Sequence, residues 1–293
     1  MLLMSGKEVS QSIREKLAAE CKEFVGTYGY APTLAVVLVG EDPASQTYVS
    51  AKRQACEDLG YGHKDFVLPA TTTQQELMEV VQRLNQDKSV HGILVQLPLP
   101  KGLDEDMVIE AIDPAKDVDG FHPQNVGRLL IGKDCFVSCT PKGVLAMLDH
   151  YGIDTDGKDV CIIGRSNIVG KPMAALLVQR GRDATVTICN THTKDLAAHV
   201  RRADIVIAAA GHPHTVTADM VKEGAVVVDV GTNRVEDSTR KKGWRLVGDV
   251  DFDTVSQKCR AISPVPGGVG PMTITMLMGN TMLAARRQAG ERV

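Results

Sequence analysis

The stretch VCIIGRSNIVGKPM, residues 160–173, decides the fold class. An apolar run ends at Gly164, a polar turn follows, and a second glycine, Gly170, precedes a helical pattern. A strand, a glycine turn and a helix in this order direct free backbone N–H groups and the positive end of the helix toward an anion, usually a phosphate. The glycine spacing matches neither GxGxxG nor a Walker A loop. The turn alone therefore leaves two interpretations open, a nucleotide site and a structural crossover turn.

The next strand favours NADP as the nucleotide. In a dinucleotide-binding fold the second strand normally ends in an acid that binds the ribose 2′-hydroxyl. Here the strand TVTIC (185–189) is followed by NTH (190–192), which contains no acid. Arg165 can instead pair with a 2′-phosphate, and the hydroxyls of Ser166 and Thr191 add hydrogen-bond donors. This combination predicts NADP rather than NAD.

Strand and helix signals alternate along the whole chain. Apolar runs typical of buried strands occupy residues 34–39, 65–68, 90–97, 159–163, 185–189, 204–209, 225–229 and 261–263. Helices are expected from Ser5, over 43–59, from Thr73, from Thr140 and over 273–288, and residues 113–125 are expected to form a polar loop. Such alternation is typical of parallel sheets covered by helices. The sequence predicts an α/β protein of two units joined near residue 140.

Composition narrows the class of protein. The chain has 293 residues, of which 43% are hydrophobic and 24% charged, so it has ample apolar material for two globular domains. Its 33 basic and 36 acidic residues give a net charge of −3, so no overall positive field attracts nucleic acid or a membrane surface. No apolar run approaches the ~18 residues of a membrane span. Seven scattered cysteines indicate reduced thiols in a cytoplasmic protein.

The helix expected over 43–59 carries a lysine among apolar residues. Lys52 lies three residues after Val49 and four before Cys56, and Tyr48 lies one turn earlier on the same face. One interpretation is a lysine whose stem covers the core while its ammonium reaches water. The other is an ammonium held in a cleft, with its pKa lowered by desolvation so that it transfers protons near neutral pH. The helix alone does not decide between them.

Other candidate residues lie at a strand end and in loops. Gln96 is at the end of a predicted parallel strand, where ligands collect in such sheets. Asp117 and Asp119 lie in the polar loop, where either acid can simply cap a turn. His212 and His214 form an HxH pair without a nearby acidic or cysteine partner, so no metal site is expected.

Six sequence strings occur in the order found in one known family. They are TYVSAKRQAC (47–56), HGILVQLPLP (91–100), KDVDGFHP (116–123), CTPKG (139–143), GRSNIVGKP (164–172) and SPVPGGVGPMT (263–273). Over essentially the whole chain they resemble the bifunctional methylenetetrahydrofolate dehydrogenase/methenyltetrahydrofolate cyclohydrolase family. The resemblance implies a catalytic α/β folate-binding domain (1–140 with 272–293) and a Rossmann-like NADP-binding domain (141–271). It also implies an active site in the interdomain cleft and a homodimer.

The resemblance implies roles for four residues of the folate domain. Lys52 matches the family's essential lysine, and Gln96 matches the glutamine that hydrogen-bonds it. Tyr48 matches a tyrosine stacked near the folate. Asp119 matches the acid that anchors the pterin.

In the cofactor domain, Gly164, Arg165 and Ser166 match the family's NADP phosphate turn. Thr191 stands where many members have serine, and it keeps the hydroxyl that a 2′-phosphate contact needs. Thr232 stands where many members have isoleucine, and we expect it to contribute backbone contacts to the cofactor, which tolerate such a change.

The implied chemistry is oxidation of 5,10-methylenetetrahydrofolate by NADP+ and hydrolysis of the methenyl product to 10-formyltetrahydrofolate. The glycine- and proline-rich segment that contains Pro264 and Gly268 can bring backbone close to a flat pterin. Two alternatives are an NAD(P) dehydrogenase of another small substrate and a non-catalytic nucleotide-binding regulator. The pair of Tyr48 and Lys52 argues against the first, and the presence of Lys52 together with Gln96 and Asp119 argues against the second.

Overall fold

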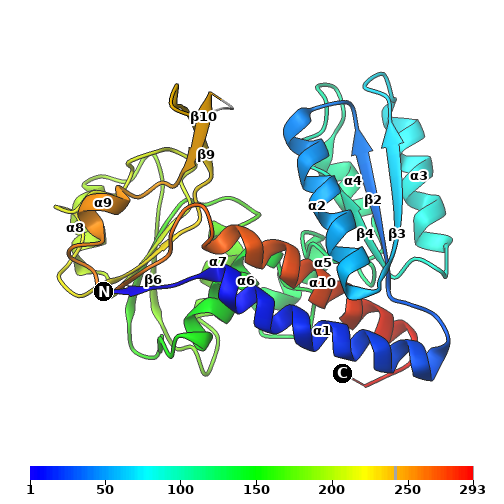
Figure 1. Ribbon diagram of the computed structural model, residues 1–293, viewed down its shortest axis with the longest axis horizontal. Coiled ribbons are helices and arrows are strands. Elements are labelled where there is room, and N and C mark those ends of the chain that lie inside the picture. Colours follow the sequence, from blue (N-terminus) through cyan, green and yellow to red (C-terminus); the bar gives the residue numbers. More distant parts are fainter. Residues whose placement is uncertain (241–242, 293) are drawn as a thin grey trace. The chain divides into compact units, whose positions relative to one another are not determined.

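The computed structural model describes residues 1–240 and 243–292 and consists of two compact units. The six-strand unit contains Met1–Ser10 and Thr140–Thr273, and the three-strand unit contains Gln11–Cys139 and Ile274–Val293. Each unit has its own parallel sheet with helices against it (Figure 1). The two-domain α/β fold expected from the sequence is therefore confirmed.

The three-strand unit is built on a parallel sheet in the order β3-β2-β4. Its strands are β2 (Thr33–Val39), β3 (Gly62–Leu68) and β4 (Gly92–Val95). The helices that begin or lie in this part of the chain are α1 (Gly6–Tyr28), α2 (Pro43–Leu59), α3 (Gln74–Gln86), α4 (Glu105–Ala111) and α5 (Pro123–Leu130). Figure 1 shows α2 and α3 on opposite sides of the sheet. Both faces of β2 are consequently buried, as its uninterrupted apolar sequence predicts.

Local sequence fixes the ends of α2, the helix that carries Lys52. The side chain of Asp42 accepts a hydrogen bond from the backbone N–H of Ser45 at 2.8 Å, and proline occupies the first helical turn. At the other end Gly60 adopts φ +75°, a left-handed conformation that suits glycine. The helix therefore spans 43–59, as predicted.

The six-strand unit has the parallel strand order β1-β11-β8-β7-β5-β6. The strands are β1 (Leu2–Leu3), β5 (Asp159–Ile163), β6 (Thr185–Cys189), β7 (Ile205–Ala208), β8 (Val226–Asp229) and β11 (Ala261–Ile262). The helices are α6 (Cys139–His150), α7 (Gly170–Leu177), α8 (Leu196–Arg202), α9 (Phe252–Val255) and α10 (Val269–Gln288), the last of which continues into the three-strand unit. Strand β6 pairs with one edge of β5, and the next strand, β7, pairs with the opposite edge, so the strand order reverses at β5. Ligands of parallel sheets bind at such a switch point, beyond the carboxyl ends of the strands.

Three of the differences between the structure and the sequence-based expectations concern the organisation of the chain. Residues 1–10 belong with the six-strand unit because β1 pairs with β11, whereas the expected boundaries placed them in the 1–140 domain. Part of the expected polar loop forms α5, which begins at Pro123 behind His122, whose side chain caps it. An antiparallel hairpin of β9 (Asn233–Glu236) and β10 (Trp244–Val247) was not expected. Among the described residues, no helix is long and apolar enough to cross a membrane.

Candidate active site and cofactor turn

Lys52 and Gln96 meet in the three-strand unit. The Lys52 Nζ donates a hydrogen bond of 2.8 Å to Gln96 Oε1, although the residues lie 44 positions apart. Gln96 is placed by the sheet, because its backbone N–H donates to the Val37 carbonyl at 2.8 Å just beyond β4. Its own side-chain amide donates to the Leu97 carbonyl at 2.7 Å, which orients Oε1 toward the lysine. A helix and a strand end thus hold an ammonium and an amide together.

Asp119 lies close enough to Lys52 for its carboxylate to affect the pKa of the lysine. Its carboxylate accepts a hydrogen bond from the Cys139 thiol, with a sulfur–oxygen distance of 3.9 Å. The fully buried side chain of Asn280, on α10, fixes the neighbouring backbone. The Asn280 amide donates to the carbonyl oxygens of Val118 at 2.8 Å and Val137 at 3.0 Å. Two loop segments and α10 therefore set the position of the acid.

Burial shifts the pKa values of the lysine and the acid in opposite directions. It lowers the pKa of Lys52 below its usual 10.5, and the nearby Asp119 carboxylate opposes this change. Burial raises the pKa of Asp119 to about 6, with Asp117 adding to the rise and Lys52 opposing it. Both groups consequently change protonation closer to neutral pH than they do in water, which is typical of groups that transfer protons. This geometry favours the interpretation of Lys52 as a held ammonium over a lysine that reaches into water.

Tyr48 and Asp117 stand at the edges of this centre with different roles. Tyr48 lies one helical turn before Lys52, and 49% of it is exposed, so its ring is accessible to a flat ligand. Asp117 is buried and its carboxylate accepts hydrogen bonds from the backbone N–H groups of Phe121 at 3.2 Å and His122 at 2.9 Å. Asp117 therefore caps a turn, whereas Asp119 does not share those contacts.

The glycine turn of the six-strand unit leaves no space for a side chain. Gly164 has φ +124°, and a Cβ atom there would overlap the carbonyl oxygen of Ala209, which follows β7. A Cβ atom on Gly170 would overlap the carbonyl oxygen of Gly164. The Gly164 N–H donates to the Cys189 carbonyl at 2.8 Å, so the turn lies against the end of β6 as well. The switch point of the sheet thus brings backbone within reach of a ligand.

The predicted cofactor residues of the six-strand unit have exposed side chains. Arg165 and Ser166 are exposed in the turn, Thr191 is exposed just beyond β6, and Thr232 is exposed just beyond β8. The Ser166 Oγ accepts a hydrogen bond from the Val169 N–H at 3.0 Å and keeps its own O–H for another acceptor. One cation, two hydroxyls and no acid after β6 fit the phosphate-bearing ribose of NADP.

The segment that contains Pro264 and Gly268 is folded tightly on itself. A Cβ atom on Gly268 would lie 2.5 Å from the Pro264 carbonyl oxygen, and one on Gly6 would overlap the Gly268 carbonyl oxygen. The Gly267 carbonyl accepts a hydrogen bond of 3.2 Å from the Lys7 N–H. Gly268 is buried in this segment, whereas Pro264 is partly exposed and Pro266 is exposed.

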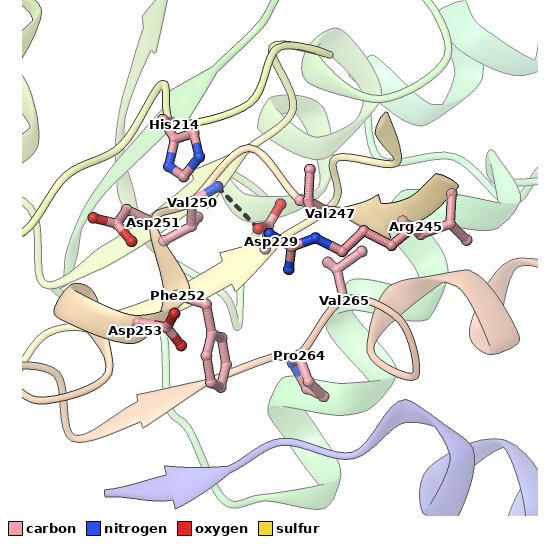
Figure 2. Close-up of a pocket in the computed structure, with 12 residues that line it drawn as sticks. His214, Asp229, Arg245, Val247, Val250, Asp251, Phe252, Asp253, Pro264 and Val265 are labelled. Carbon is pink, nitrogen blue, oxygen red and sulfur yellow. Dashed lines mark hydrogen bonds between the residues drawn. The ribbon is translucent and has the colours of Figure 1, made fainter. Parts of the chain in front are cut away.

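A cavity of about 210 Å³ lies in the six-strand unit but does not include the glycine turn (Figure 2). Its walls include His214, Arg245, Phe252 and Asp253. Of the predicted site residues only Pro264 lines it. The cavity is therefore separate from the predicted phosphate turn.

Comparisons with known proteins identify the family. The family profile "Tetrahydrofolate dehydrogenase/cyclohydrolase, catalytic domain" matches residues 4–119. The profile "Tetrahydrofolate dehydrogenase/cyclohydrolase, NAD(P)-binding domain" matches residues 138–289. The chain belongs to the tetrahydrofolate dehydrogenase/cyclohydrolase family. The resemblance found in the sequence strings is thereby confirmed.

Members of this family are similar to the chain over its full length. The protein named Bifunctional protein FolD from Chlorobium luteolum is 54% identical over 294 residues, which cover 99% of this chain and 100% of that protein. A crystal structure of the bifunctional FolD methylenetetrahydrofolate dehydrogenase/cyclohydrolase from Campylobacter jejuni has a TM-score of 0.93 and 50% identity, covering 98% of this chain and 99% of that one. The Trypanosoma brucei methylenetetrahydrofolate dehydrogenase–cyclohydrolase, solved with NADP cofactor and inhibitor, has a TM-score of 0.95 and 40% identity, covering 99% of each chain.

Sequence reasoning missed some residues that organise the candidate site and the glycine turn. Asn280 and Cys139 fix the surroundings of Asp119, and Asp229 and Asp249 fix loops beside the cofactor turn. A signal was present for three of them. Asn280 interrupts an apolar helix, and each acid directly follows or precedes apolar residues. Polar groups at such positions are buried only when they have partners.

Proposed function

We propose that the chain carries out two consecutive reactions on tetrahydrofolate derivatives. The first is NADP-dependent oxidation of 5,10-methylenetetrahydrofolate to 5,10-methenyltetrahydrofolate, and the second is hydrolysis of that product to 10-formyltetrahydrofolate. The observation that carries the proposal is the Lys52 ammonium held 2.8 Å from Gln96 with Asp119 nearby. A non-catalytic regulator has no need of such a group.

The exposed residues around the glycine turn bind the cofactor in this proposal. Arg165 pairs with the 2′-phosphate, and the hydroxyls of Ser166 and Thr191 donate to phosphate oxygens. Thr232 contributes backbone contacts at the end of β8. When bound, NADP+ supplies the acceptor for the hydride that leaves the methylene bridge. Hydride transfer itself requires alignment rather than a side-chain acid.

Lys52 moves the protons of the hydrolysis. As water adds to the methenyl carbon, the neutral amine takes the proton that the water releases. The resulting ammonium gives a proton to the ring nitrogen as the carbon–nitrogen bond breaks and the ring opens. The hydroxyl of the adduct loses its proton to solvent as its oxygen becomes the formyl carbonyl, so the hydrolysis releases one proton overall. The lowered pKa of Lys52 increases the fraction of neutral amine near pH 7. Gln96 holds Nζ in place through its 2.8 Å hydrogen bond.

In the three-strand unit, Asp119 and Tyr48 hold the pterin. The Asp119 carboxylate accepts two N–H bonds from the amino-pyrimidinone edge, much as acids recognise similar edges of nucleic-acid bases. The half-exposed ring of Tyr48 stacks on the folate.

We also propose that the chain forms a homodimer and acts in the cytoplasm. The dimer rests on the family resemblance, and a light-scattering mass in solution tests it. The location is supported by the cysteines, since no disulfide joins any of them in the part of the chain that the structure describes.

The activity is tested by mixing the protein with 5,10-methylenetetrahydrofolate and NADP+ and recording the absorbance of reduced nicotinamide. Hydrolysis is followed separately as the loss of methenyltetrahydrofolate absorbance, with buffer-catalysed hydrolysis subtracted. We expect both reactions. Oxidation of other small substrates but not of the folate would contradict the proposal, and so would binding of NADP+ without any turnover.

A further inference from the structure

Two buried acids in the six-strand unit are linked to each other through backbone. Asp229 ends β8, and Asp249 follows β10; they are 3% and 0% exposed. The Asp229 Oδ1 accepts hydrogen bonds of 2.9 Å from the N–H groups of Gly231 and Asp249, and its Oδ2 accepts one of 3.0 Å from Val250. Figure 2 shows the bond between Asp229 and Val250 beside the cavity. The Asp229 carboxylate thus ties the end of β8 to the segment after β10.

Asp249 ties the same place to the loop after β7. Its Oδ2 accepts hydrogen bonds from the N–H groups of Ala210 at 2.6 Å and Gly211 at 2.8 Å. Its Oδ1 accepts one of 2.9 Å from the side-chain amide of Asn233. That amide also donates to the Gly248 carbonyl at 3.2 Å. The Asp249 carboxylate therefore joins the loop after β7 to Asn233, the first residue of β9.

Two glycines leave the space that these carboxylates occupy. A Cβ atom on Gly231 would overlap the Asp249 carboxylate, and one on Gly248 would overlap the Asp229 carboxylate. Asp249 thus lies against Gly231, which is two residues beyond Asp229. Asp229 lies against Gly248, which directly precedes Asp249. Burial raises the pKa of Asp229 to about 6, and the adjacent Asp249 adds to this rise. Two neighbouring buried carboxylates cost folding stability, an arrangement that is common at functional sites.

The backbone that the acids hold lies beside the cofactor turn. Ala209, immediately before the Asp249-bound loop, donates its N–H to the Ile163 carbonyl at 2.8 Å and leaves no space for a side chain on Gly164. Thr232 lies between Gly231, held by Asp229, and Asn233, held by Asp249. We propose that Asp229 and Asp249 are positioning residues for NADP, which hold the loops after β7 and β8 in the shape that the cofactor contacts. This inference rests on the proposed function, because it assumes that the cofactor binds at the Gly164 turn.

The variant Asp249→Asn tests the proposal. An asparagine can keep an acceptor toward Ala210 and Gly211 only by turning its own donor toward Asn233, so at least one contact is lost. We expect the dissociation constant for NADP+, measured by calorimetry, and the KM for NADP+ to rise about tenfold or more, which corresponds to about 1.4 kcal/mol. Hydrolysis of methenyltetrahydrofolate, whose proposed proton-transfer residue lies in the three-strand unit, should stay within twofold of the parent.

The matched control is Asp219→Asn, which makes the same change at an exposed acid of the same unit. Its NADP+ affinity should equal that of the parent. A folded Asp249→Asn protein with a lowered melting temperature but unchanged NADP+ affinity would overturn the proposal, because that result indicates a purely structural role.

A second variant covers the case in which Asp249→Asn does not fold. Asn233→Ala removes one contact to Asp249 from a half-buried side chain and leaves both acids in place. We expect a three- to tenfold weaker NADP+ affinity, and an unchanged affinity would overturn the proposal. Absence of NADP+ binding by the parent protein would instead contradict the proposed function.

Discussion

Replacement of Lys52 by methionine separates the two interpretations of this residue. Methionine keeps an unbranched apolar stem but has no exchangeable proton. A lysine that only covers the core would be replaced with little effect on either reaction. A lysine that transfers protons would leave hydrolysis of methenyltetrahydrofolate without its acid–base group. We expect the hydrolysis rate to fall by ~10²–10⁴-fold, the usual contribution of general acid–base catalysis.

The expected loss of hydrolysis rate can be compared with the expected change in folding stability of the Lys52→Met variant. A fall of ~10²–10⁴-fold corresponds to ~2.7–5.4 kcal/mol of activation free energy. The variant also loses the 2.8 Å hydrogen bond to Gln96, and an unsatisfied buried acceptor costs about 1–3 kcal/mol of stability. Gln96 is only half-buried, so water can replace part of the lost hydrogen bonding. Burial disfavours the charged form of Lys52, so removal of this ammonium offsets part of the remaining loss of stability. The variant should therefore fold while losing most of its hydrolysis activity.

The assay follows methenyltetrahydrofolate hydrolysis on variant and parent proteins of matched melting temperature. Oxidation of methylenetetrahydrofolate should fall less, since hydride transfer depends on alignment. The control is Lys64→Met in the same unit, which removes an ammonium that pairs with Asp87 and Ser89 at the surface and should leave both rates unchanged. A hydrolysis rate within about threefold of the parent in Lys52→Met would refute the role in proton transfer.

Three further changes test the binding sites. The parent should prefer NADP+ to NAD+ by ~10-fold or more in kcat/KM, and Arg165→Ala should abolish most of this preference, because one charge-assisted phosphate contact contributes ~1.5–3 kcal/mol; equal use of both cofactors by the parent would contradict the assignment. Only the ionised form of Asp119 accepts two N–H bonds, and its pKa is about 6, so affinity for a folate analogue should increase as pH rises through 6. In Asp119→Asn, calorimetry should show weaker binding without this increase, and an unchanged affinity would place the pterin anchor elsewhere. Gly164→Ala should lower the free energy of unfolding by at least ~1–3 kcal/mol in a denaturant titration, because φ is +124° and the methyl group would overlap the Ala209 carbonyl; an unchanged midpoint would show that the turn adapts.

The central strands of the two parallel sheets, such as β2 and β7, could be predicted because they are buried on both faces and therefore consist largely of apolar residues. The hairpin β9–β10 escaped prediction for the opposite reason. In Asn233–Glu236 the partly buried and exposed residues alternate, and the sequence is rich in polar residues, as it is in many loops. β1 is only two residues long, so its place depends on pairing with β11 rather than on any local pattern. Both elements form because each pairs with another strand, and the local sequence pattern carries no information about that pairing.

The candidate site was predictable residue by residue but not in its connections. Lys52 could be singled out by its apolar neighbours on α2, yet its partner Gln96 lies 44 residues away and only the fold brings them together. Asn280 is 162 residues from Val118, whose carbonyl it holds. Periodicity indicates which face of a helix is buried, whereas it does not indicate which distant polar group meets that face.

The charge of the substrate connects the pKa shifts of Lys52 and Asp119 to the reaction. Burial alone favours the neutral forms of both groups, which suits the lysine as a base but weakens the acid as an anchor. The methenyl product of the oxidation carries a positive charge. A nearby cation lowers the pKa of an amine further and also lowers that of a carboxylic acid. In the proposed mechanism, binding of this cation would therefore shift Lys52 toward the neutral amine that accepts a proton from water, and it would shift Asp119 toward the carboxylate that we propose to hold the pterin. The intermediate itself would thus bring both residues into the protonation states that the proposed hydrolysis requires.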